Sequence, residues 1–155
     1  MDRTVFSFSA TDVGYKHIKE KPPKVCEDFS DHYDEDDFHI CVVADGHGSD
    51  NYPRTYKGSK FAVEACIKQI KQFVKDFDCS ENLEQLLEDK EYRILKQLVK
   101  SILNEWYYSV NSDVENNPFT ESELVNVSEK YKVRYFSENP KERKIEKAYG
   151  VDDCY

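Results

Sequence analysis

The sequence lacks the segments that would carry it into or across a membrane. It contains no run of about 18 apolar residues, and residues 1–20 lack the apolar core of a signal peptide. Its five cysteines are odd in number, widely spaced and include no Cys-x-x-Cys pair. We therefore expect a cytoplasmic protein with reduced thiols, without a membrane partner and without a zinc site.

Positive charge is missing from one part of the chain. The segment from Glu27 to Asp50 holds nine acidic residues and no Lys or Arg, whereas the remaining acidic and basic residues balance at 22 each. The whole net charge of −9 therefore belongs to this segment. Such a surface repels polyanions and attracts hard cations, so we expect no nucleic-acid partner. A solvated acidic loop is the alternative interpretation.

Two common phosphate- and calcium-binding motifs are also missing. There is no glycine-rich phosphate loop. An EF-hand loop starting at Asp31 would need glycine at its sixth position and glutamate at its twelfth, but these positions hold Asp36 and Val42. Any cation site must therefore be built in another way.

The first part of the chain has the alternation of strands. Apolar and polar residues alternate over residues 4–10, which predicts a strand. Residues 25–33 and 38–44 flank the acidic connection Asp34–Asp37 and predict a β-hairpin.

Helices are predicted for the rest of the chain. Apolar residues at helical spacing predict one helix over residues 59–77 and a second from Ser80 to the proline of "ENNPF". The segment Thr120–Glu123 has the pattern of a capping box at the start of a shorter helix. Strands followed by helices indicate an α+β fold. The two long helices offer more apolar surface than so small a sheet can cover.

The predicted hairpin register brings carboxylates together. If Tyr33 pairs with Phe38, Asp28 becomes the diagonal neighbour of Asp45 on the same face of the sheet. A slip of one residue would bring Glu27 to that face instead. Either register places an acid beside Asp45, and a divalent ion with oxygen ligands would relieve the repulsion between the two carboxylates.

The second strand ends in Asp45-Gly46-His47-Gly48. Glycine permits a tight turn and lets a backbone carbonyl approach an ion. His47 is then a candidate metal ligand or proton donor. The alternative is an ordinary turn in which Asp45 caps backbone NH groups.

These residues resemble a known family. "CEDFS" and "FHICVVADGHGS" are similar to the first two motifs of the metal-dependent protein phosphatases of type 2C, the PPM family, in its bacterial branch. "GYKH", "RTYKGSKFAVEAC", "ILNEWYYSVNSDVENNPFTESEL" and "EKAYG" resemble further landmarks of that family in the same order. The resemblance covers residues 8–150.

The resemblance implies a four-layer α-β-β-α sandwich, in which two antiparallel sheets are flanked by antiparallel helix pairs. It also implies that a hydroxide bridging two Mn²⁺ or Mg²⁺ ions attacks the phosphorus of a phosphoserine or phosphothreonine in a protein substrate. By resemblance, Asp45 bridges the metals, the Gly46 carbonyl binds one of them, and Glu27 and Asp28 act directly or through water. His47 is then the general acid.

Two departures from the family limit this expectation. The family often has an arginine before the acidic pair to bind the substrate phosphate, whereas the nearest bases here are Lys24 and Lys21, so Lys24 is the candidate for that role. The family also supplies further aspartate ligands much later in its chain. Asp152 and Asp153 cannot replace them, because they lie where a core strand should start.

We therefore expect residues 1–155 to be the N-terminal portion of one PPM-type phosphatase domain, truncated after about residue 150. Such a fragment would hold at most one ion weakly, would be inactive, and would pair with its missing C-terminal half or with itself. The alternative is a catalytically silent, phosphatase-derived binding module.

Overall fold

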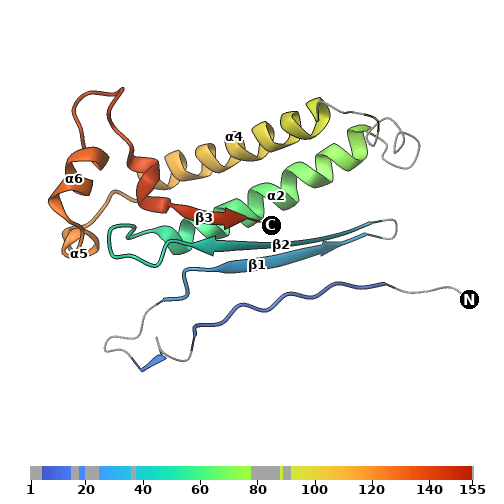
Figure 1. Cartoon of the computed structure of the whole chain (residues 1–155), viewed down its shortest axis with the longest axis horizontal. Helices are drawn as coiled ribbons and strands as arrows, with labels where there is room; N and C mark the ends of the chain where they lie inside the picture. The colour runs from blue at the N-terminus through green and yellow to red at the C-terminus, as the bar shows by residue number, and fades with distance from the viewer. Residues whose placement is uncertain are drawn as a thin grey trace, which may run out of the picture.

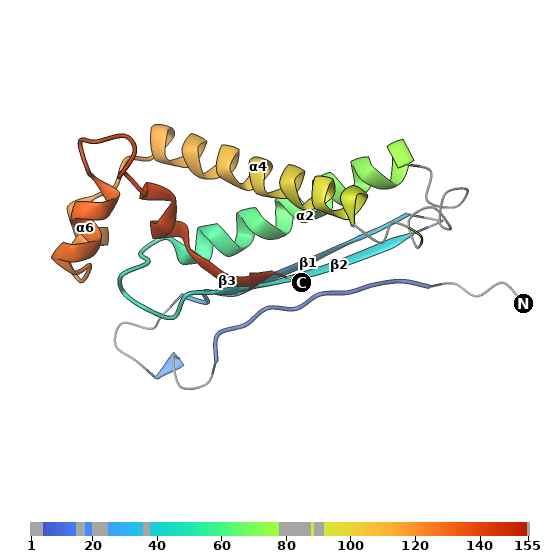
Figure 2. The same ribbon diagram turned by 45° about the horizontal axis from the view of Figure 1, so that its top comes forward.

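The computed structural model describes residues 5–14, 18–19, 25–35, 38–77, 88 and 92–154, the side chains of 152–154 excepted. The elements in chain order are β1 (Phe29–Asp34), β2 (His39–Gly46), α2 (Thr55–Phe77), α4 (Arg93–Asn116), α5 (Glu121–Leu124), α6 (Glu129–Tyr135), the 3-10 helix η1 (Ile145–Tyr149) and β3 (Val151–Cys154). The three strands form one antiparallel sheet in the order β1-β2-β3. Both long helices cover one face of this sheet (Figures 1 and 2). The α+β prediction is confirmed, but a second sheet is not found among the described residues.

The hairpin is present, but the predicted register is wrong by two residues. Asp34 pairs with His39 and Phe29 with Ala44, so the connection runs from Glu35 to Phe38. The Glu35 NH donates to the Phe38 carbonyl at 3.0 Å and closes this turn. The Asp34 carboxylate also accepts a hydrogen bond from His39 Nδ1 at 2.8 Å, which favours the observed pairing. A shift of two residues leaves every side chain on its predicted face.

The predicted N-terminal strand is extended, and the hydrogen bonds described between it and β1 all involve a side chain of β1. Residues 5–14 run beside β1 (Figures 1 and 2) and are assigned no strand. Ser7 bonds to Asp34, Ser9 Oγ lies 3.1 Å from His32 Nδ1, and Thr11 bonds to Ser30 on the outer face of β1. This spacing aligns the segment antiparallel to β1.

The core lies between the sheet and α2. Burial alternates along β2, so that Ile40, Val42 and Ala44 point inward and the residues between them point outward. These three side chains pack against Ala62 and Val63 of α2. Such alternation is what one buried sheet face produces. No described helix has both the length and the hydrophobicity of a membrane span.

The second predicted helix does not continue through Tyr92. This residue has φ 53° and ψ 32°, in the left-handed region, and α4 begins only at Arg93. A bulky residue in that region interrupts a right-handed helix, which apolar periodicity does not register. The proposed cap at Ser80 lies outside the described residues. The end before Pro118 is confirmed, because α4 ends at Asn116.

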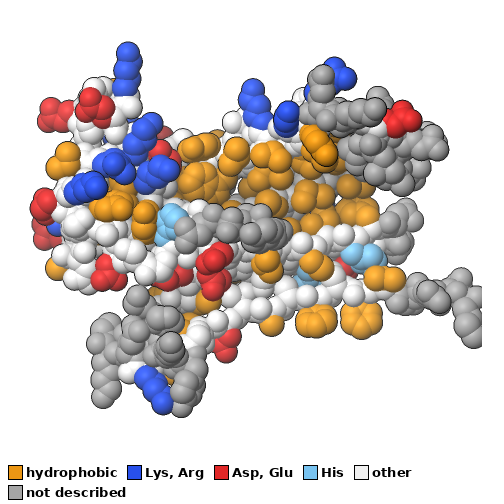
Figure 3. All heavy atoms as spheres, viewed as in Figure 1, with side chains coloured by type: hydrophobic (Ala, Val, Ile, Leu, Met, Phe, Trp, Pro, Cys, Tyr) orange, Lys and Arg blue, Asp and Glu red, His pale blue; other side chains and the backbone are white. Residues whose placement is uncertain are grey.

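The helices carry more apolar surface than the described sheet covers, as predicted. One side of α4 packs towards α2 through half-buried Trp106 and fully buried Val110. An exposed apolar stripe runs along its neighbouring side and consists of Leu95, Val99, Leu103 and Tyr107. Hydrophobic side chains accordingly form a broad patch over α4 and α2 (Figure 3).

Candidate functional site

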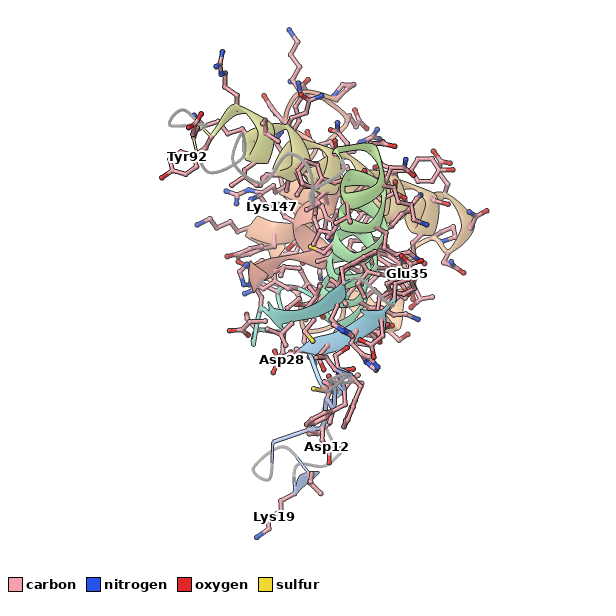
Figure 4. All side chains as sticks on the ribbon, turned by 90° about the vertical axis from the view of Figure 1, so that its right-hand side faces the viewer. Asp12, Lys19, Asp28, Glu35, Tyr92 and Lys147 are labelled. Carbon is pink, nitrogen blue, oxygen red and sulfur yellow. The ribbon has the colours of Figure 1, made fainter. Side chains whose placement is uncertain are left out.

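Carboxylates from the hairpin and the N-terminal segment line one depression at the end of the sheet. Continuing the observed register by one residue places Asp28 opposite Asp45. Asp28 Oδ1 accepts a hydrogen bond from the Gly46 NH at 3.1 Å. Asp12, Asp28 and Asp45 line one depression, the acidic hollow, together with Ala10, Thr11, Phe29, Ser30, Val43 and Ala44. Figure 4 shows Asp28 at the side of the sheet away from the helices, with Asp12 beyond it.

The acidic hollow has the donors that a hard cation prefers. Mn²⁺ and Mg²⁺ take oxygen ligands and keep several water molecules when the protein supplies only one or two carboxylates. The described residues contain no group of three or more His, Cys, Asp or Glu side chains close enough to hold a metal ion. The arrangement therefore fits a hydrated, partly held ion and does not form a closed coordination shell.

Glu27 lies on the other face of the hairpin from Asp28. Its backbone carbonyl accepts a hydrogen bond from Ser59 Oγ of α2 at 2.5 Å. A Cβ atom on Gly46 would lie 2.2 Å from this carbonyl, so only glycine fits there. One Glu27 carboxylate oxygen lies 3.6 Å from where a Cβ on Gly48 would be, which places the side chain beside the turn. Asp28, and not Glu27, therefore shares the face of Asp45.

His47 is fixed at both its backbone and its ring. Its NH donates to Thr55 Oγ1 at 2.7 Å. The imidazole centroid lies 4.1 Å from that of Tyr52, and a Cβ on Gly150 would lie 2.4 Å from His47 Cδ2. The half-buried ring is thus held between the loop that follows β2 and the start of β3.

The first turn of α2 connects the candidate site to the C-terminal part of the chain. Thr55 is 3% exposed, and its hydroxyl both accepts from the His47 NH and donates to the Gly150 carbonyl at 2.7 Å. The Arg54 NH donates to the Ala148 carbonyl at 3.0 Å. These bonds make the position of His47 depend on the junction of η1 and β3.

A buried arginine that the sequence patterns do not predict organises the same region. Arg54 is 2% exposed. Its guanidinium binds both carboxylate oxygens of Glu123, at 2.7 and 3.1 Å, and one oxygen of Asp113 at 3.2 Å. It also donates to the Tyr149 hydroxyl at 2.7 Å and lies 3.9 Å above the ring of Phe119. One side chain therefore joins the start of α2 to the end of α4, to α5 and to η1.

The network shifts the pKa of each partner towards the observed charge state. Burial alone would lower the pKa of Arg54, but hydrogen bonds to Glu123 and Tyr149 raise it above its usual value. The Arg54 bond lowers the pKa of Glu123 to about 2. Burial would raise the pKa of Asp113, yet hydrogen bonds from Tyr149 and Lys57 lower it. Burial raises the pKa of Tyr149, so its hydroxyl stays protonated and donates to Asp113.

Sequence signals existed for some members of this network. The capping box at Thr120 is confirmed, since its hydroxyl accepts from the Glu123 NH and the Glu123 carboxylate accepts from the Thr120 NH. "EKAYG" marked the segment before a strand, and β3 follows it.

Asp152 and Asp153 lie within β3, where a strand was expected. Lys24 lies outside the described residues.

Comparison with known proteins adds one finding. The family model described as Protein phosphatase 2C matches residues 13–144. The matched segment includes the hairpin, the Asp45–Gly48 turn and the helices α2, α4, α5 and α6. No curated protein and no solved structure matches the chain.

Proposed function

Because the chain belongs to the protein phosphatase 2C family, we propose that it is the N-terminal portion of a metal-dependent protein serine/threonine phosphatase domain. Its substrates are then phosphoserine and phosphothreonine residues of proteins, and the reaction is hydrolysis of the phosphomonoester. The observation that carries the proposal is the convergence of Asp28 and Asp45 on one hollow beside the Asp45–Gly48 turn.

We assign the metal-binding role to Asp28 and Asp45, with the Gly46 carbonyl and Glu27 beside them. Bound Mn²⁺ or Mg²⁺ would supply a water molecule acidic enough to be deprotonated near neutral pH. The bond from the Gly46 NH orients Asp28, and the bond from Ser59 orients the backbone at Glu27. The chain would thus contribute pre-positioned oxygen ligands from β2 and from the residues just before β1.

His47 is assigned as the general acid that protonates the leaving alkoxide. A histidine suits this task because its ordinary pKa lies near neutrality. The Thr55 bond fixes its backbone, and the contacts with Tyr52 and Gly150 restrict its ring. Such restraint is what a proton donor needs if it is to meet one oxygen of the substrate.

Metal binding is the first test. Titration calorimetry with Mn²⁺ should show weak binding to the wild-type chain and none to Asp45→Asn. Asp50→Asn removes one charge from the same acidic segment but lies outside the acidic hollow, so it should bind like the wild type. Equal binding by Asp45→Asn and the wild type would mean that Asp45 is only a turn residue.

Activity is the second test, and we expect residues 1–155 alone to be inactive. Hydrolysis with two metals needs ligands on both sides of the shared water, and the described residues offer only a partial set. General acid catalysis contributes about 10²–10⁴-fold and cannot replace the missing nucleophile. Phosphate release from a phosphothreonine peptide with Mn²⁺ should be absent. Turnover that both Asp45→Asn and His47→Ala abolish would refute the expected inactivity.

A catalytically silent binding module is the second candidate. The absence of a cluster of three metal-ligating side chains among the described residues favours it. It would be supported if Mn²⁺ does not bind and if appending a C-terminal half from the same family produces no turnover. A cytoplasmic location is part of either proposal, in line with the absence of disulfide bonds among the described cysteines Cys26, Cys41 and Cys66.

A further inference from the structure

A group of exposed cations surrounds one depression near the candidate site. This basic hollow is lined by Lys130, Val133, Arg134, Ser137, Glu142, Lys144 and Lys147. Figure 3 shows blue side chains gathered over α6 and η1, the elements that carry three of the four cations. Residues 129–147 hold seven Lys or Arg against four Glu, although the chain as a whole is acidic.

These four cations have no ion-pair partner among the described residues. Within the described part of the chain, Lys130, Arg134, Lys144 and Lys147 form no ion pair, and Arg134 makes only a ring contact, 5.8 Å above Tyr131. All four side chains are exposed. Like charges held together without partners repel one another, and an anion placed between them would remove that repulsion.

The basic hollow is held in place relative to the loop that carries His47. Asn51 of that loop accepts hydrogen bonds from the NH and hydroxyl of Ser128, at 3.0 and 2.9 Å, at the start of α6. Its carbonyl accepts from the Tyr135 hydroxyl at 2.7 Å. On the other side of the hollow, the Lys144 NH donates to the Arg134 carbonyl at 2.9 Å.

Ring contacts continue from the site to the hollow. His47 lies against Tyr52, and Tyr52 meets the ring of Tyr131 edge-on at 5.7 Å between centroids. Arg134 lies over that same Tyr131 ring. The rings of Tyr52 and Tyr131 therefore lie between His47 and a ligand in the basic hollow.

We propose that the basic hollow binds an acidic segment of the protein substrate, next to the phosphorylated residue that is hydrolysed. This inference rests on the proposed phosphatase function and adds a substrate class to it. A peptide can place its acidic residues in the hollow and uncharged residues elsewhere. A nucleic acid is charged along its whole length and would meet the acidic segment from Glu27 to Asp50.

Peptide binding without metal tests this inference separately from catalysis. The probe is a fluorescein-labelled peptide with one phosphothreonine followed by a run of glutamates, and binding to the full chain is measured by anisotropy. The hollow variant is Lys130→Gln/Lys144→Gln/Lys147→Gln. The matched control, Lys60→Gln/Lys96→Gln/Lys100→Gln, removes the same charge from exposed positions on α2 and α4. Circular dichroism checks that both variants are folded.

The hollow variant should bind the probe about tenfold more weakly and with a shallower salt dependence, whereas the control should stay within about twofold of the wild type. A peptide with glutamines in place of the glutamates should bind as weakly as the hollow variant binds the probe. The inference is overturned by equal losses in both variants, by absence of probe binding, or by tighter binding of a single-stranded RNA that the hollow variant loses. Failure of Mn²⁺-dependent hydrolysis in a completed domain would refute the proposed function instead, and leaves this binding result unaffected.

Discussion

Replacing Arg54 by methionine should destabilise the chain more than any change of a surface charge. Methionine keeps much of the side-chain length but removes the guanidinium from a position that is 2% exposed. Asp113, whose side chain is 10% exposed, and Glu123 then lose their shared cation. The two backbone carbonyls of Asn117 and Pro118 lose their donors as well.

The expected loss follows from leaving buried charge without its partner. Breaking a buried ion pair from one side costs about 3–5 kcal/mol, because the desolvated carboxylates are no longer compensated. Lys57 still reaches both oxygens of Asp113, at 2.9 and 3.0 Å, which limits the effect to the lower part of that range. We therefore expect the free energy of unfolding to fall by about 3 kcal/mol.

Urea unfolding followed by the fluorescence of Trp106 measures this loss. The indole packs in the core and donates to the Gly58 carbonyl at 3.0 Å, so it reports on the contact between α4 and α2. Lys68→Met is the control, because its ion pair with Glu105 involves a side chain 65% exposed and should cost less than about 1 kcal/mol.

The outcome that refutes this reasoning is an Arg54→Met loss no larger than that of Lys68→Met. A variant that is unfolded without urea would meet the expectation only if Arg54→Lys, which keeps the charge, still folds. The free energy of unfolding of Arg54→Lys should lie between those of the wild type and of Arg54→Met, because lysine cannot bind Glu123 with two parallel bonds.

Three further predictions concern acid stability, the clamp on His47 and the exposed stripe. Because the pKa of Glu123 is about 2 in the folded chain and 4.5 ordinarily, its contribution is complete above about pH 4.5 and is lost as pH falls towards 2. Glu123→Gln should make stability depend less steeply on pH over that interval. An unchanged pH dependence would contradict the lowered pKa of Glu123. Thr55→Val removes the bonds to His47 and Gly150 and should cost about 1–3 kcal/mol by calorimetry, while Thr55→Ser should stay near the wild type. Val99→Lys/Leu103→Lys should reduce concentration-dependent association in sedimentation experiments, and equal association would show that the stripe is not the contact surface.

The strand pattern was predictable because it is local. Alternation of apolar residues identifies the face of each hairpin residue, and a shift of two residues leaves those faces unchanged. For this reason the common face of Asp28 and Asp45 could be predicted although the pairing Tyr33–Phe38 was wrong. The observed register is decided by the turn at Glu35–Phe38 and by the Asp34–His39 contact, neither of which alternation specifies.

The beginning of α2 was not predictable from apolar spacing. The expected helix starts at residue 59, but the observed one starts at Thr55. Its first turn is buried through polar residues, since Thr55 is 3% and Ser59 0% exposed. Both side chains bond to backbone atoms of segments far away in the chain, and a periodicity of apolar residues cannot detect such bonds.

The sequence by itself therefore determined the α+β class, the hairpin, the acidic segment and the turn at Asp45–Gly48, because these depend on the order of neighbouring residues. Only the tertiary structure decided that Arg54 is buried, that Thr55 holds His47 against Gly150, and that the cations of α6 and η1 surround one hollow. The bonds that position Arg54 and His47 join residues up to 95 positions apart. Burial of a polar group is favourable only when distant partners complete its hydrogen bonds, and folding brings those partners together.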